Sequence, residues 1–247
     1  MDILNGTQTV TRALDILFAL AESNGTLSVG EIAEKVSIPE STTYRFIQIL
    51  EQNGIVVRKG KGQIRLGMRI LDLARSLNQQ MDKELLSIAL SVMEDLTKST
   101  NETSLLFIRS DTKAICLQNI KSKALIQFSV ENGRILPLHS GASGKIILAY
   151  ENDKLKKRIL DQLPCQVDKE LLIKELEQIR NQGYSITRGE VDSDVFAISA
   201  PILNVDGSIV ASLSIAGPNY RCREENVLSM IDSVVKAAKR VSEELGN

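Results

Sequence analysis

Ser41, Thr42, Thr43 and Arg45 lie close together in the sequence and are of the types that form hydrogen bonds with base edges and phosphates. The residues that follow them, 46–50, are mostly apolar. A helix with this division would bury its second half and leave the polar first half free to contact another molecule. The first chemistry to consider is therefore recognition of DNA, whose major groove admits one helix.

A local excess of positive charge surrounds this segment. The chain has 247 residues and a net charge of −1, but residues 41–70 hold six basic side chains against Glu51 alone. Lys59 and Lys61 lie within this stretch, where they would neutralise phosphates and make DNA binding depend on salt. A solvated basic surface without a partner is the alternative.

The residues before this segment predict the elements that position it. Apolar residues at helical spacing over 9–25 indicate a first helix that ends at a turn. Ser28 and Glu31 form a capping box, the pattern that starts a helix, and Ser37 and Glu40 form a second one shortly after. Two helix starts at this distance leave room for one short helix and a tight turn, which is the spacing of a helix-turn-helix.

The next elements complete a winged helix-turn-helix. The second capping box would start a third helix from about Pro39 to Asn53, and residues 55–67 indicate a β-hairpin with a glycine-containing tip. We therefore expect a DNA-binding domain over residues 1–67, which inserts the polar start of its third helix into the major groove. A winged helix that contacts proteins is the alternative. The expected DNA contacts are Ser28, Ser41, Thr42, Thr43, Arg45, Lys59 and Lys61.

The rest of the chain predicts a second, larger domain, so the fold class is α+β. Residues 68–82 indicate a linker helix, broken near 79–82, and residues 83–247 mix helices with strands. Turn signals between neighbouring strands indicate a largely antiparallel sheet. The expected strands are 104–110, 113–120, 124–130, 184–190, 195–203 and 208–217, and the expected later helices are about 143–151, 153–163, 168–182 and 224–245.

Two of these strands alternate in an informative way. In 195–203 and 208–217, one face carries large apolar residues and predicts a core, while the opposite face carries small or hydroxyl side chains. That second face is either open to solvent or the floor of a cavity. Few charges interrupt it, which favours a cavity that holds a small polar molecule.

The segment 136–150, LPLHSGASGKIILAY, places small residues before a helix. It lacks the spacing of a Walker A phosphate loop, so nucleotide binding is not expected. Free backbone N–H groups at the start of such a helix could bind an anion such as a carboxylate. A glycine-rich turn with close backbone packing is the alternative.

The residue counts exclude several classes of function. The sequence has one histidine, His139, and three distant cysteines, so a His-based metal site, Ser/His/Asp catalysis and a disulfide framework are not expected. We expect His139 to fix its loop by a hydrogen bond, and we do not expect Cys222 to sense redox state. The sequence has no run of about 18 apolar residues and no signal-peptide pattern, which predicts a cytoplasmic protein. No cofactor is expected.

Four motifs in order resemble one family. TVTRALDIL, SVGEIAEKVSIPESTTYRFIQILEQNGIV, LPLHSGASGKIILA and GYSITRGEVD with ISAPILNVDGSIVASLSIAGPNYR are similar to IclR-type transcriptional regulators over essentially the whole chain. The resemblance implies an N-terminal winged helix-turn-helix and a C-terminal effector-binding domain with a GAF-like sheet. It also implies a dimer or dimer of dimers on a palindromic DNA operator, and an effector that is a small organic or aromatic acid.

The resemblance also implies a set of effector-binding residues. The chain departs from the family at Ala197 and Ala216, where some members place a cysteine or a serine, so a ligand has fewer hydrogen bonds available. The implied pocket residues are Leu125, Phe128, Leu136, Ala142, Ser143, Ala197, Ser214 and Ala216.

We therefore expect a ligand-responsive, DNA-binding regulator, most simply a repressor, that is not an enzyme. A transcriptional activator of the same family and a winged-helix protein without a small-molecule ligand are the alternatives. An enzyme with a fused DNA-binding domain finds no support, because the sequence shows no nucleophile–base pair or metal cluster.

Overall fold

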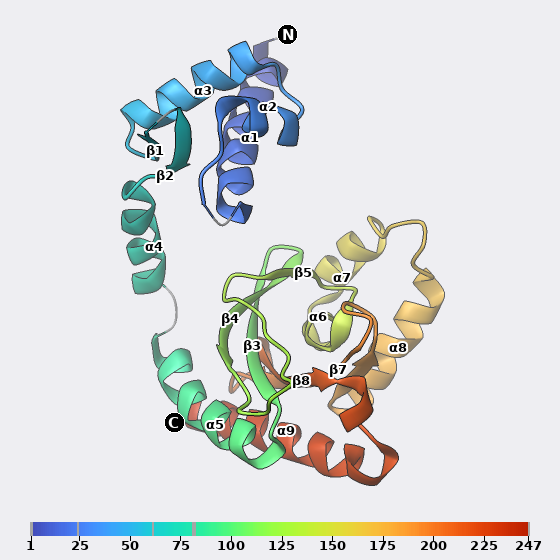
Figure 1. The fold of residues 1–247 in the computed structure, drawn as a ribbon. Helices are drawn as coiled ribbons and strands as arrows, with labels where there is room; N and C mark the ends of the chain where they lie inside the picture. The colour runs from blue at the N-terminus through green and yellow to red at the C-terminus, as the bar shows by residue number, and fades with distance from the viewer. Residues whose placement is uncertain (1, 24, 61, 81–82, 247) are drawn as a thin grey trace. The chain divides into compact units, whose positions relative to one another are not determined.

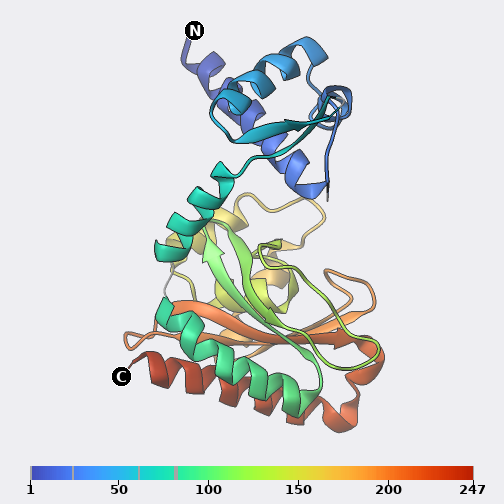
Figure 2. The ribbon, with the colours of Figure 1, turned by 60° about the vertical axis from the view of Figure 1, so that its left-hand side comes forward.

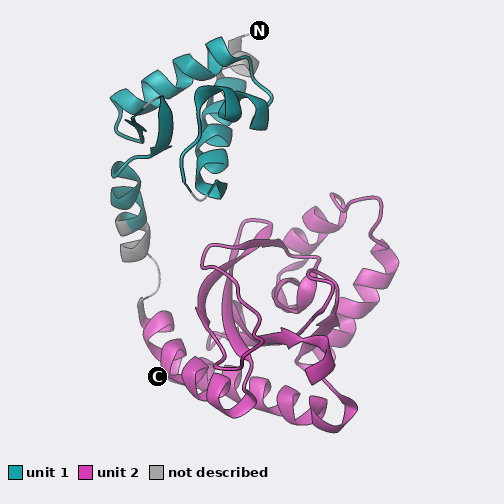
Figure 3. Cartoon of the chain, in the orientation of Figure 1, with its two compact units in different colours: residues 1–81 teal, residues 82–247 magenta. Residues whose placement is uncertain are grey.

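The computed structural model describes residues 2–23, 25–60, 62–80 and 83–246. The chain forms two compact units, residues 1–81 and 82–247 (Figures 1 and 3). The linker helix expected over 68–82 is represented by α4, Arg69–Gln80, and residues 81–82, where part of the expected break falls, lie outside the described residues. The exact domain limits stay a prediction.

Unit 1 is a helix-turn-helix with a two-stranded wing. Its core contains Ile16 and Leu20 of the first helix, Ile32 of the second, Ile47 of the third, and Ile64 of the wing. The two wing strands pair in antiparallel register, which confirms the expected hairpin. The elements before the linker helix are α1 Asp2–Glu22, α2 Val29–Lys35, α3 Glu40–Gln52, β1 Val56–Lys59 and β2 Gln63–Leu66.

The first capping box forms and the second does not. At Ser28 the side chain accepts the N–H of Glu31 and the Glu31 carboxylate accepts the N–H of Ser28, at 2.7 Å for the second bond. Ser37 instead has a φ of +53° in the turn between α2 and α3. This left-handed conformation ends α2, so Ser37 is not the residue that starts α3. The helix α3 begins after Pro39 without a side-chain cap, and the prediction of a second capping box was wrong.

Unit 2 is built on a six-stranded sheet in the order β5-β4-β3-β8-β7-β6. Every neighbouring pair is antiparallel, as expected. The strands are β3 Thr103–Ser110, β4 Lys113–Ile120, β5 Ile135–Pro137, β6 Ser185–Arg188, β7 Val195–Leu203 and β8 Ile209–Pro218. The helices are α5 Lys83–Thr100, α6 Gly141–Tyr150, α7 Asp153–Leu160, α8 Lys169–Gln182 and α9 Glu224–Leu245, with a short 3-10 turn at Asn219–Arg221.

The two faces of this sheet are covered by different helices. On one face α5 and α9 lie side by side (Figure 2). Phe196, Ile198, Leu213 and Ile215 pack against them in a core. This is the apolar face that the alternation predicted. On the other face the sheet curls around α6, which contacts all six strands (Figure 1). The predicted α+β class with an antiparallel sheet is confirmed.

One expected strand is absent from its predicted place. The segment 124–130 belongs to a loop, and the edge strand is β5, which pairs with β4. The loop is held by bonds from side chains rather than by a strand ladder: Thr103 Oγ1 donates to the carbonyl of Phe128 at 2.7 Å, and Arg221 Nη2 to that of Ile126 at 2.7 Å. The alternation of apolar and polar residues could not reveal this, because the loop has the burial pattern of a strand. Phe128 is half-buried, and Leu125, which would lie on the opposite face of a strand, is fully exposed.

None of the helices in the described part of the chain is long and apolar enough to span a membrane.

Candidate functional site

The first candidate site is the exposed face of α3 in unit 1. Ser41, Tyr44, Arg45 and Gln48 are all exposed, and their spacing of three and four residues places them on one side of the helix. Thr42, at the edge of this face, is half-buried. The face offers hydroxyl, guanidinium and amide groups, which are the groups that contact bases and phosphates.

Thr43 does not belong to this face, and its prediction as a DNA contact was wrong. Its side chain is completely buried. Its hydroxyl donates to the carbonyl of Pro39 at 3.2 Å and lies 3.5 Å from that of Ile38. The hydroxyl therefore bonds to the backbone at the start of α3 instead of facing outward. The sequence could not distinguish Thr43 from Ser41 and Thr42, because all three are short polar residues.

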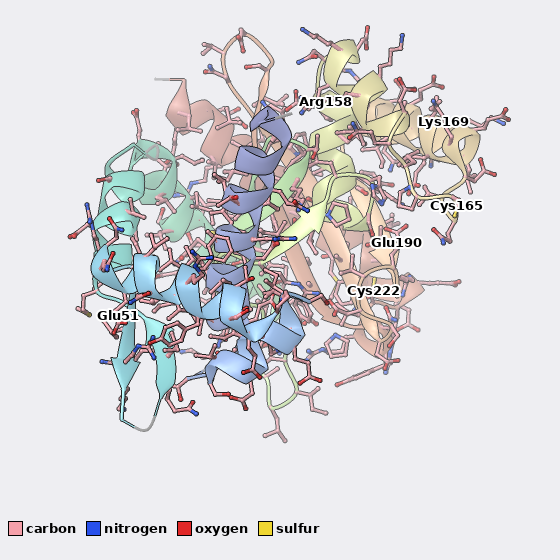
Figure 4. All side chains as sticks on the ribbon, turned by 90° about the horizontal axis from the view of Figure 1, so that it is seen from above. Glu51, Arg158, Cys165, Lys169, Glu190 and Cys222 are labelled. Atoms are coloured by element: carbon pink, nitrogen blue, oxygen red, sulfur yellow. The ribbon has the colours of Figure 1, made fainter. Side chains whose placement is uncertain are left out.

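Tyr44 and Gln48 were missed by the sequence analysis. The ring of Tyr44 is stacked by the guanidinium of Arg58, 5.1 Å from the ring centroid. Arg58 Nε also donates to Glu51 at 2.9 Å, which ties the wing to α3. Glu51 is labelled on this helix in Figure 4. The helical spacing from Ser41 could have revealed both residues: Tyr44 lies three residues after Ser41, and Gln48 lies within 46–50, a segment expected only to pack.

The other predicted DNA contacts have different surroundings. The Ser28 hydroxyl donates to Glu31 Oε2 at 2.7 Å, so its observed role is to cap α2. Lys59 is exposed at the end of β1. Lys61 lies outside the described residues.

The second candidate site is a cavity in unit 2, between the start of α6, the 121–134 loop and the segment 187–197. The space open to the centres of water molecules inside it is about 50 Å³, and one buried water needs roughly 10–15 Å³ in this measure. A few waters or a compact ligand fit as the cavity stands. Six of the predicted effector residues line it: Phe128, Leu136, Ala142, Ser143, Ala197 and Ala216.

Two predicted effector residues lie elsewhere. Leu125, in the 121–134 loop, is fully exposed and does not line the cavity. Ser214 is completely buried under α6, and its Oγ lies 2.8 Å from both Ser143 Oγ and Ser199 Oγ. The small-residue face is therefore mostly covered by α6, and only its end at Ala197 and Ala216 reaches the cavity.

The start of α6 is occupied by side chains of the protein itself. The N–H of Gly141 donates to Glu190 Oε2 at 2.7 Å, and the N–H of Ala142 donates to Thr187 Oγ1 at 3.2 Å. A side chain on Gly141 would meet Val191 Cγ2 at 2.8 Å, so the backbone is tightly packed here. The turn is close-packed, as one of the two alternatives expected, and the N–H of Gly141 binds a carboxylate of the protein itself, that of Glu190. Binding of an external anion at this helix start stays a prediction.

Charged side chains that sequence reasoning missed surround the cavity. Lys145 is buried and pairs with Glu175 at 2.8 Å and with Glu190. Arg134 Nη2 donates to both oxygens of Asp192, at 3.1 and 3.0 Å. Arg134, Glu190 and Asp192 line the cavity. Arg134 lies 58 residues from Asp192, and Lys145 of α6 lies 45 residues from Glu190, so no local pattern brings these pairs together.

Burial shifts the pKa values of His139 and Cys222. His139 is half-buried and does not line the cavity; burial and the nearby Lys145 lower its pKa. Its expected hydrogen bond stays a prediction. Burial raises the pKa of the Cys222 thiol, which disfavours the reactive thiolate. In the described part of the chain, no cluster of three or more potential metal ligands occurs.

A helix-turn-helix unit with an exposed polar helix face, joined to an α+β unit that holds a ligand-sized cavity, defines a transcriptional regulator that binds DNA. Residues 9–60 match the IclR helix-turn-helix domain, and residues 79–243 match the domain described as bacterial transcriptional regulator IclR C-terminal. The chain belongs to the IclR family of bacterial transcriptional regulators. It is thus a regulator and not an enzyme, as expected.

Individual relatives extend along the whole chain. The HTH-type transcriptional repressor AllR of Escherichia coli K12 is 29% identical over 249 residues, which cover 98% of this chain and 91% of that protein. The Thermotoga maritima IclR structure is 28% identical, covers 98% of this chain and 100% of that one, and has a TM-score of 0.72. The Microbacterium hydrocarbonoxydans IclR homologue, solved with 4-hydroxybenzoate, is 23% identical and covers 96% of this chain and 98% of that one, with a TM-score of 0.78. The last of these shows likeness of fold alone.

Proposed function

We propose that this protein is a ligand-responsive repressor whose effector is a small organic or aromatic acid. The observation that carries the proposal is the cavity, in which apolar walls such as Phe128 and Leu136 surround the start of α6 and the guanidinium of Arg134. An apolar cavity with a few charged groups is the usual form of a small-molecule site. The space of about 50 Å³ favours a compact acid, and an aromatic acid would require the walls to move.

The proposed DNA partner is a palindromic operator bound by a homodimer or a dimer of dimers. Ser41, Tyr44, Arg45 and Gln48 would contact the major groove, with Lys59 on the phosphates. The name of the Escherichia coli relative supports repression, and activation by the same mechanism is the alternative. Effector binding would change operator affinity through a coupling of about 1–3 kcal/mol, or roughly 5–150-fold.

A thermal-shift screen of aliphatic and aromatic acids tests the effector class, because a ligand specific for the folded state raises the unfolding temperature. The acids that do so are then added to a DNA-binding assay with a fragment selected from a random pool. We expect at least one acid to stabilise the protein and to weaken DNA binding. The Ala197→Leu variant, which fills the cavity, is the control and should lose both effects.

Three results would contradict parts of the proposal. If no acid raises the unfolding temperature of the parent, the effector class is wrong. If stabilising acids act equally on Ala197→Leu, they bind elsewhere. If they strengthen DNA binding, the protein is not a repressor relieved by its effector.

A further inference from the structure

The cavity contains one basic side chain and two acidic ones among the described residues that line it. The basic side chain is Arg134, and the acidic ones are Glu190 and Asp192. Two of the N–H groups that the helix start would offer to an acid are already used, because Gly141 donates to Glu190 and Ala142 donates to Thr187. An acidic effector that binds Arg134 therefore meets two carboxylates of the protein and competes with the one that Arg134 holds.

The two carboxylates are held with different strength. Glu190 accepts bonds from the Gly141 N–H and from Lys145, whose side chain is only 6% exposed. Moving Glu190 away would leave a buried ammonium with Glu175 as its remaining partner in the described structure, which is unfavourable. Glu190 is therefore a fixed part of the cavity wall.

In the described part of the chain, the Asp192 carboxylate is held by one partner, Arg134, in a partly exposed ion pair. The side chains of Arg134 and Asp192 are 31% and 38% exposed, and their bonds measure 3.0 and 3.1 Å. Pairs this open to water contribute little, because solvent screens the charges and both side chains lose freedom in the pair. Asp192 can turn into solvent at small cost and leave the guanidinium facing the cavity.

We infer that Arg134 is the residue that selects acids and that Asp192 competes with the effector's carboxylate for it. The inference rests on the proposed effector-binding function of the cavity. The planar fork of an arginine matches the two oxygens of a carboxylate, and both recorded bonds to Asp192 come from Nη2 alone. A neutral amide of the same shape offers Arg134 one uncharged acceptor, so it competes with the Asp192 carboxylate much less well than an acid does.

The test measures the dissociation constants of four compounds by calorimetry: propionate and propionamide, and benzoate and benzamide. The parent is compared with Arg134→Gln, Asp192→Asn and Glu190→Gln. Arg109→Gln is a control for loss of one surface arginine, because Arg109 pairs with Glu151 and does not line the cavity. Circular dichroism verifies that each variant is folded.

We expect the parent to bind at least one acid more tightly than its amide. Arg134→Gln should weaken acid binding about tenfold or more and bring acid and amide to the same affinity, whereas Arg109→Gln should bind as the parent does. Asp192→Asn should strengthen acid binding about two- to fivefold, the range expected for removing a half-exposed competitor. Glu190→Gln should not strengthen it.

The two proposals fail in different ways. If the parent binds no acid, the proposed effector class is wrong and this inference falls with it. If the parent binds acids and Arg134→Gln binds them equally well, the effector class stands and the role of Arg134 is overturned. A gain of affinity in Glu190→Gln but not in Asp192→Asn would identify Glu190 as the competitor and overturn the role of Asp192.

Discussion

Two variants of α3 distinguish a residue that stabilises the helix from a residue that contacts DNA. Thr43→Val tests the stabilising role, and Arg45→Ala tests the DNA contact. Valine has the shape of threonine without its hydroxyl. The hydroxyl donates to Pro39 at 3.2 Å inside a completely buried site. The Pro39 carbonyl also accepts the N–H groups of Thr42 and Thr43, each at 2.9 Å, so it keeps partners in the variant.

The expected loss of stability follows from these contacts. Removing one hydrogen bond while its acceptor stays satisfied costs about 0.5–1.5 kcal/mol. Thr43→Ala also removes a buried methyl group, which adds about 1 kcal/mol. Arg45 is exposed and no large effect on stability is expected from its replacement, but the loss of a base contact should weaken specific binding by about 1–3 kcal/mol.

The assay has two parts. Urea unfolding gives the free energy of unfolding, and fluorescence anisotropy gives affinities for a fragment selected from a random pool and for a scrambled fragment of the same length. Below the unfolding transition, Thr43→Val should keep the parent's ratio of the two affinities, and Arg45→Ala should reduce it. If Thr43→Val unfolds as the parent does but loses its preference for the selected fragment, Thr43 contacts bases and its assignment to packing is refuted.

Three further outcomes are expected from other parts of the structure. Lys59→Ala should reduce the slope of log affinity against log salt by about one unit, because one phosphate contact is lost; an unchanged slope removes the wing from the interface. Burial raises the pKa of Glu102 to about 7 from an ordinary value of 4.5. Between these values the folded chain holds a proton that the unfolded chain releases, so the free energy of unfolding should fall as pH rises from 4.5 to 7, by up to roughly 3 kcal/mol. Glu102→Gln should remove this dependence in urea unfolding at several pH values, and its persistence would assign it to other groups. Ser214→Ala should lower the free energy of unfolding by about 1–3 kcal/mol, because it breaks the hydroxyl contacts to Ser143 and Ser199. A loss of acid binding without a loss of stability would instead show that Ser214 contacts the ligand.

Local signals predicted the elements of this fold well. The capping box at Ser28 and Glu31 is formed by residues three apart, so its pattern is complete in the sequence. The alternation of Phe196, Ile198 and Ala200 likewise defines a core face, because successive side chains of a strand point to opposite sides. The failure at Ser37 has a conformational cause: its left-handed φ of +53° is set by the turn between two helices, and its side chain gives no sign of it.

The functional surfaces were predicted less completely because they depend on tertiary contacts. Alternation places Ser199 and Ser214 on one face of the sheet, but it does not tell which helix covers that face. The exposure of Tyr44 depends on the direction in which α3 packs. Arg134 and Asp192 meet only because two loops converge at the start of α6, and the nearest signal was the position of Arg134 just before the segment 136–150.

These contacts change which residues can determine the effector. A face rich in serine suggests a ligand held by hydroxyl groups, but the Ser214 hydroxyl bonds to that of Ser143 on α6 and to that of Ser199 on the neighbouring strand. Hydrogen bonds that are already made inside the protein offer a ligand little, because breaking them costs about as much as the ligand would gain. The charged groups that line the cavity, Arg134, Glu190 and Asp192, come from loops, which vary more readily than the strands and helix beneath them. Charge at the loops, rather than the hydroxyl groups of the sheet, should therefore decide which molecules this protein recognises.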